Sequence, residues 1–253
     1  MTTTVSLWRL TRAETRKLFT TRAMPAIFAA AIALILVAVV VQAAVAGQQG
    51  TPPLDTDAGV YKLLNIGVVP CLVMLIVGIL AAGGEYRHRT IVPTLLASPR
   101  RGRVFAVKVL VIGVTGAAFG AISFGIGLGA VVAELSAHHL HRLPPATGSL
   151  YAGAIIASAG LGMIGVALGA LTRNTVGAIV AAIAWTILIE QIILQAIVPG
   201  IEKWLPTHAA VTLTASPAAG HTLSLTTPSL LLAGYAAAIL LVASRTTLNR
   251  DIA

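Results

Sequence analysis

The sequence is poor in charge and holds a single cysteine. Charged residues make up 10% of the 253 residues, whereas a soluble domain has about 25%. Hydrophobic residues make up 57%, and the mean hydropathy is +0.92. This composition excludes a water-soluble enzyme and a disordered chain. Because Cys71 has no second cysteine to pair with, a secreted disulfide scaffold is excluded as well.

Motifs for common chemistries are also missing. There is no Gly-x-x-x-x-Gly-Lys-Ser/Thr loop, so we expect no ATP hydrolysis by this chain itself. Neither His-Glu-x-x-His nor Gly-x-Ser-x-Gly occurs. His138, His139 and His141, with Glu134 nearby, invite a metal site, but their spacing is not a known zinc pattern and we interpret them as a polar loop. We therefore predict no catalytic, cofactor-binding or metal-binding residue.

Long apolar runs dominate what is present. Runs of about 20 apolar residues are long enough to cross a bilayer as helices. The sequence predicts an all-α, polytopic membrane protein that forms one transmembrane domain over residues 1–253. Six spans are expected, at Met24–Val45, Asn65–Gly83, Val109–Val132, Tyr151–Leu171, Val176–Val198 and Pro228–Ala243. The first is longer than the apolar core of a signal peptide, so we expect it to be retained.

The basic residues are distributed unequally between the connections. With six spans, 14 of the 17 Lys and Arg, among them Lys17, Arg87 and Lys108, fall on the side of the N-terminus, and three fall on the other. Cytoplasmic segments carry the excess of Lys and Arg. Both termini are therefore predicted to be cytoplasmic, and the multi-pass topology fits a bacterial plasma membrane.

Two further segments are neither ordinary spans nor ordinary loops. Residues 1–22 place Arg9, Arg12 and Arg16 on one side of a helix, with Leu7 and Leu18 opposite. We expect an N-terminal amphipathic helix in the membrane interface, the alternative being a solvated leader. Residues 199–227 are too apolar for a solvated loop. They are expected to fold back into the membrane as a re-entrant segment, or to lie as a lid on the lipid surface.

Within the spans, one acid and several glycines stand out. Glu190 lies in an apolar run with Gln191 and Gln195 nearby, and we expect these residues to line a pathway or, alternatively, Glu190 to serve packing alone. Gly116-x-x-x-Gly120 and Gly165-x-x-x-Gly169 permit close helix approach, most simply within one subunit.

The connection over residues 84–108 is densely charged. It contains Gly84-Glu85-Tyr86-Arg87-His88-x-Thr90, then Leu95-Leu96-x-Ser98-Pro99-x-Arg101, then Lys108. This pattern, together with the six spans, the N-terminal helix and the long outer connection, resembles the ABC-2 type permeases, the membrane subunits of bacterial ATP-binding-cassette exporters. Pro93 departs from the family pattern and puts the start of the expected coupling helix in question.

The resemblance implies a function and partners. The chain would be the permease subunit of an exporter, moving a drug, antibiotic or lipid, paired with a second permease copy or a related permease. A separate ATPase subunit would hold ATP and Mg²⁺. The residues carried over as coupling to that subunit are Glu85, Arg87, Thr90, Leu95, Leu96 and Arg101. Two alternatives stay open: a non-transporting membrane scaffold or sensor that recruits a cytoplasmic partner, and an integral membrane lipid-modifying enzyme.

Overall fold

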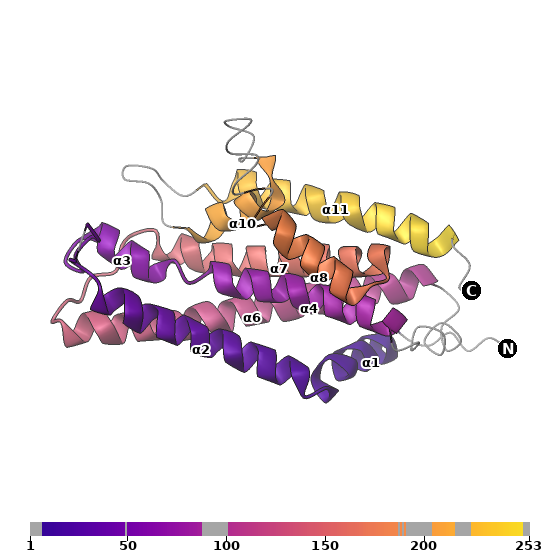
Figure 1. Ribbon diagram of the computed structural model, residues 1–253, viewed down its shortest axis with the longest axis horizontal. Helices are drawn as coiled ribbons and strands as arrows, with labels where there is room; N and C mark the ends of the chain where they lie inside the picture. Colours follow the sequence, from indigo (N-terminus) through magenta and orange to yellow (C-terminus); the bar gives the residue numbers. More distant parts are fainter. Residues whose placement is uncertain are drawn as a thin grey trace.

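The structure is a computed structural model that describes residues 7–48, 50–87, 101–186, 188, 190, 204–215 and 224–249. It is all-helical, with 85% helix and no strand in these ranges. The helices run as a long bundle (Figure 1). In chain order they are α1 (Leu7–Thr20), α2 (Ala23–Ala44), α3 (Asp57–Leu64), α4 (Val68–Arg87), α6 (Arg101–Ala137), α7 (Thr147–Thr172), α8 (Thr175–Ala184), α10 (Pro206–Thr214) and α11 (Thr226–Asn249).

Five helical stretches in the described part of the chain are long and apolar enough to cross a membrane. They are Ala23–Ala44, Asp57–Arg87, Gly102–Ala137, Thr147–Thr172 and Thr226–Arg245. These coincide with five of the six predicted spans and fit a multi-pass membrane protein. The expected fifth span, Val176–Val198, begins with α8, which has only 10 residues. Its second half, residues 191–198, lies outside the described residues.

Helix α7 lies at the centre of the bundle and contacts α4, α6, α10 and α11. Glycines allow this close packing. A Cβ atom added at Gly165 would collide with the carbonyl group of Leu75 in α4, and one added at Gly116 of α6 would lie 2.7 Å from the carbonyl oxygen of Ser158. Both glycine motifs therefore join helices within one subunit, as the sequence predicts.

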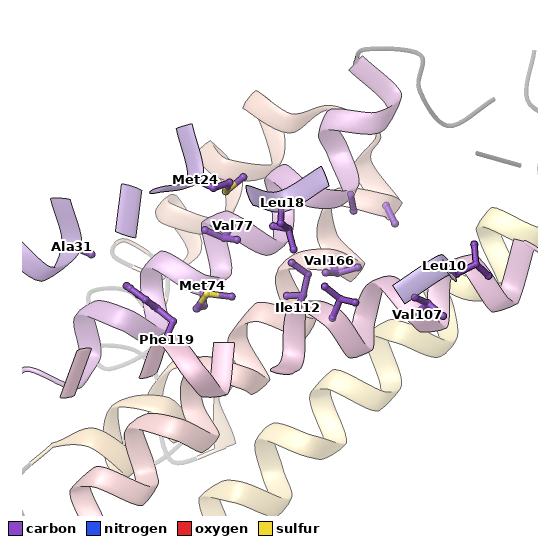
Figure 2. Packing of buried hydrophobic residues seen from close by; sticks show 13 residues of the cluster. Leu10, Leu18, Met24, Ala31, Met74, Val77, Val107, Ile112, Phe119 and Val166 are labelled. Atoms are coloured by element: carbon purple, nitrogen blue, oxygen red, sulfur yellow. The ribbon is translucent and has the colours of Figure 1, made fainter. Parts of the chain in front are cut away.

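Helix α1 packs across the end of the bundle at which α4 ends and α6 begins. Leu10, Glu14 and Leu18, spaced by four residues, form its buried stripe, and Figure 2 shows Leu10 and Leu18 beside Val107 of α6 and Val77 of α4. Leu7, which the sequence placed on the apolar side with Leu18, is not part of this stripe and is 56% exposed. The stripe with four-residue spacing fixes the orientation of α1, and it includes an acid that the helical-wheel argument passed over.

Local sequence explains the breaks around α8 and α10. Helix α7 ends at Thr172, because the next residue, Arg173, has a left-handed φ of 52°. Asn174 then caps α8 by accepting a hydrogen bond from the amide of Gly177 at 3.1 Å. Helix α10 starts with Pro206, which suits the first helical position. Within the predicted re-entrant range 199–227, α10 packs against α7 and α11, while residues 199–203 and 216–223 lie outside the described chain.

Candidate functional site: a buried charge cluster and an apolar cavity

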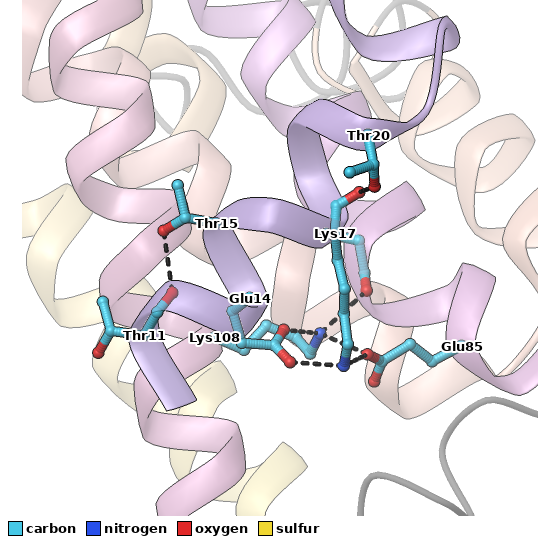
Figure 3. Close-up of polar contacts among 8 residues, drawn as sticks. Thr11, Glu14, Thr15, Lys17, Thr20, Glu85 and Lys108 are labelled. Atoms are coloured by element: carbon cyan, nitrogen blue, oxygen red, sulfur yellow. Dashed lines mark hydrogen bonds and ion pairs between the residues drawn. The ribbon is translucent and has the colours of Figure 1, made fainter. Parts of the chain in front are cut away.

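Four charged side chains meet where α1 crosses α4 and α6 (Figure 3). Lys17 Nζ lies 2.6 Å from Glu14 Oε1 and 2.8 Å from Glu85 Oε1. Lys108 Nζ lies 2.5 Å from Glu14 Oε2 and 3.0 Å from Glu85 Oε1. Each ammonium group therefore contacts both carboxylates, and the four formal charges cancel. We call these four residues the charge cluster.

The charge cluster is largely shielded from solvent. The exposed fractions of the side chains are 6% for Glu14, 9% for Glu85 and 8% for Lys108, against 41% for Lys17. Lys108 also donates a hydrogen bond to the carbonyl oxygen of Ala81 at 3.3 Å. Buried charges are tolerated only when they are paired, and removing one partner leaves an uncompensated charge. The cluster thus ties three helices together in one arrangement.

Burial and pairing act on ionisation in opposite directions in α1. Burial by itself would raise the pKa of Glu14, but the charges and hydrogen bonds of Lys108 and Lys17 outweigh it and hold this pKa below its ordinary value. Burial would likewise lower the pKa of Lys17, but hydrogen bonds and charges from Glu14 and Glu85 hold it above its ordinary value. Both groups are therefore charged at neutral pH.

A second contact fixes the end of α4 from another side. The guanidinium carbon of Arg173 lies 5.3 Å from the centre of the Tyr86 ring, a cation–π contact with the corner between α7 and α8. Glu85 and Tyr86 are consecutive, so the last turn of α4 is attached to α1 and α6 through one residue and to α7 through the next. The charged connection starts from this doubly attached turn.

The predicted coupling residues separate into three groups. Glu85 lies in the charge cluster, where its carboxylate faces α1 and leaves little surface for a second protein. Arg87 is exposed at the end of α4, and Arg101 is the first residue of α6. Thr90, Leu95 and Leu96 lie outside the described residues.

Three residues of the cluster were not predicted as a site. From the sequence, Lys17 was interpreted as an orientation charge and Lys108 as an orientation charge and the last residue of the family-like pattern, while Glu14 was not singled out. Two signals were present: Glu14 is the only acid of the basic leader, with Lys17 three residues on, and Lys108 directly precedes an apolar run. Nothing in the sequence pattern showed that these residues meet.

Glu190 lies deep in the protein at 1% exposure, beyond the end of α8. Its Oε1 accepts hydrogen bonds from Trp185 Nε1 at 2.6 Å and Thr207 Oγ1 at 2.9 Å. Its Oε2 has no hydrogen-bond partner among the described residues. Thr207 lies in the first turn of α10, so the carboxyl group faces the positive end of that helix dipole.

Trp185 and Thr207 also line an apolar cavity of about 330 Å³. Side chains from α4, α7, α8, α10 and α11 surround it, including Leu75, Ile164 and Tyr235. This size and lining are typical of a site for an apolar small molecule. Glu190 lies behind the wall formed by Trp185 and Thr207, while Gln191 and Gln195 lie outside the described residues.

The histidines of the connection after α6 are exposed. Within the described ranges, no group of three His, Cys, Asp or Glu side chains is placed to hold a metal ion.

No protein-family model matches the sequence, and no curated protein matches it. The charge cluster can hold α1, α4 and α6 in one arrangement, and the cavity can accept an apolar molecule.

Proposed function

We propose that this chain is the permease subunit of an ATP-binding-cassette exporter in a bacterial plasma membrane. It would move an apolar or amphipathic substrate (a drug, antibiotic or lipid), using ATP and Mg²⁺ bound by a separate ATPase subunit. Support comes from the long apolar helices, the concentration of basic residues on the side of the N-terminus, and the pattern of residues 84–108. In this proposal both termini are cytoplasmic.

The charge cluster is the observation that carries the proposal. Glu85 and Lys108 lie near the two ends of the charged connection. Glu85 pairs with Lys17 of α1, Lys108 pairs with Glu14 of α1, and Glu85 and Lys108 also pair with each other. A force applied to residues 88–100 therefore reaches α1, α4 and α6 together. Transmission of this kind needs helices that move as packed units between discrete arrangements. Glu85 acts here as a positioning residue that anchors the connection.

The transport pathway needs more helices than one chain offers. We propose that a second copy, or a related permease, supplies the other wall. Helix α8 presents an apolar side to the outside of the bundle, with Val176 and Val180 each 60% exposed. The cavity behind α8 provides an apolar lining within reach of that side, with Glu190 as the polar group beside it.

Co-purification with transport measurement tests this function. The chain is expressed together with its neighbouring genes, purified and placed in vesicles, and ATP-dependent export of an apolar fluorescent dye is followed. We expect a protein with an ATP-binding loop to co-elute and export to depend on its P-loop lysine. Glu85→Gln is expected to reduce export with membrane insertion intact, whereas Glu134→Gln at the far end of α6 serves as the matched control.

Each result separates the candidates. If no ATPase co-elutes, the permease proposal fails. If an ATPase binds but no substrate moves, the chain is a scaffold or sensor. If Glu85→Gln exports normally, the charge cluster has no part in coupling, although the chain remains a permease.

A further inference from the structure

Helix α1 has a second, outward face opposite the one that packs on the bundle. The residues along this face form a shallow hollow lined by Trp8, Thr11, Arg12, Thr15, Arg16 and Phe19. Their spacing by three and four residues places them on one side of the helix. Trp8 is 72% exposed and Phe19 49% exposed, so large aromatic side chains stand at both ends of the hollow with much of their surface uncovered.

Two arginines are the groups of the hollow that can receive an anion. The hydroxyl groups of Thr11 and Thr15 donate hydrogen bonds to the carbonyl oxygens of Leu7 and Thr11, each at 3.0 Å, so these two donors are already used. Arg12 and Arg16 are exposed and form no ion pair with any described residue. The acid of α1, Glu14, lies on the opposite face within the charge cluster. Two guanidinium groups therefore face outward, and arginine forks bind phosphate well.

The surroundings of the hollow are apolar. The ring of Phe19 lies 6.4 Å from that of Phe28 in α2, measured between centroids. Phe28 lies in the second turn of α2, a candidate spanning helix with exposed Leu34, Val37 and Val41 further along. The hollow thus continues into the apolar outer surface of α2. A soluble acidic peptide would not match such a surface, whereas a molecule with a phosphate and hydrocarbon chains would.

We propose that this hollow binds the headgroup of an anionic phospholipid from the surrounding bilayer. Arg12 and Arg16 contact the phosphate, and Trp8 and Phe19 flank the glycerol region at the level where aromatic residues gather in membrane proteins. Helix α1 is then held from both sides, by the charge cluster toward the bundle and by lipid outward. The inference needs the spanning helices to lie in a bilayer and does not depend on the transport proposal.

Trp8 provides the signal for a direct test. The full chain is purified in zwitterionic micelles and titrated with phosphatidylglycerol or with phosphatidylcholine of the same acyl chains. The difference between the fluorescence of each protein and that of its Trp8→Phe counterpart isolates Trp8. We expect saturable, blue-shifted emission with phosphatidylglycerol and little change with phosphatidylcholine.

Paired arginine variants then locate the site. The double variant that combines Arg12→Gln and Arg16→Gln is expected to weaken phosphatidylglycerol binding about 30-fold, because each basic group near an anionic surface contributes about 1 kcal/mol. Arg9→Gln removes an exposed charge that does not line the hollow, and should change binding less than about threefold.

Three results would overturn the proposal. Equal binding of both lipids would remove the headgroup from recognition. If Arg9→Gln weakened binding as much as Arg12→Gln or Arg16→Gln alone, the attraction would be diffuse and the hollow would not be a site. The same spectral change with inorganic phosphate alone, at matched concentration, would show an anion site that does not need a lipid.

Discussion

Replacing Lys108 with methionine is the most direct challenge to the charge cluster. Methionine keeps the length and apolar stem of the side chain and removes the ammonium group. Lys108 is 8% exposed and lies 2.5 Å and 3.0 Å from two carboxylates that are themselves 6% and 9% exposed. Breaking a buried pair costs about 3–5 kcal/mol, because the remaining charge is left without a partner. Lys17 still contacts both carboxylates, so we expect about 3 kcal/mol.

Lys17→Met is the matched comparison. Its side chain is 41% exposed and makes the same two kinds of contact, at 2.6 Å and 2.8 Å. Solvent screens an exposed pair, so its loss is expected to cost about 1 kcal/mol or less. The two variants remove the same group from the same two carboxylates, and they differ in burial and in the hydrogen bond from Lys108 to the Ala81 carbonyl oxygen.

The assay is reversible unfolding of the purified protein in mixed micelles, followed by tryptophan fluorescence. The double variant Glu14→Gln with Lys108→Met should lose less than the sum of the single losses, by about 0.5–3 kcal/mol, since the two residues interact directly. If Lys108→Met destabilises no more than Lys17→Met, or if the double variant is simply additive, burial of the cluster does not control its energetics.

Further expectations concern pH, helix packing and the buried acid. The pKa of Glu14 is lowered and that of Lys17 is raised in the folded protein, so both groups stabilise the fold at neutral pH. The stabilisation from Glu14 is lost as pH falls below 4.5 through its folded pKa, and that from Lys17 is lost as pH rises above 10.5 through its folded pKa. Thermal unfolding between pH 3 and 11 should show a loss of stability at both extremes, and Glu14→Gln should reduce the loss at acid pH. Gly165→Ala should destabilise by several kcal/mol because its Cβ meets α4, whereas Gly234→Ala, with open space around it, should be neutral or stabilise by up to about 1 kcal/mol in the same unfolding assay. Glu190→Leu leaves two donors unpaired at about 1–3 kcal/mol each, while Glu190→Gln keeps an acceptor and should cost clearly less; a loss for Gln as large as for Leu would show that the charge itself is required.

The sequence predicted the apolar helices well for a physical reason. A helix satisfies its own backbone hydrogen bonds, so a long apolar run has few structural choices in lipid, and α2, α7 and α11 start within four residues of the predicted bounds. The start of helix α8, at Thr175, lies one residue from the predicted bound, but its end at Ala184 was not predicted, because the chain there passes into a π-helical turn that no composition marks.

The charge cluster shows the limit of sequence reasoning more clearly. Lys17 and Glu85 are 68 residues apart, and Glu14 and Lys108 are 94 apart. Helical periodicity relates residues only a few positions apart. Which acid meets which base depended on how α1 crosses the bundle, and this in turn was set by the stripe of Leu10, Glu14 and Leu18.

That separation has a consequence for biosynthesis. Helix α1 leaves the ribosome early, but Lys108 follows Glu14 by 94 residues, which at about 5–20 residues per second takes roughly 5–20 s. During this interval Lys17, three positions along the same helix, is already within reach of Glu14. The first helix made can thus complete its contacts with the bundle only after Lys108, at the start of the third apolar run, has been synthesised.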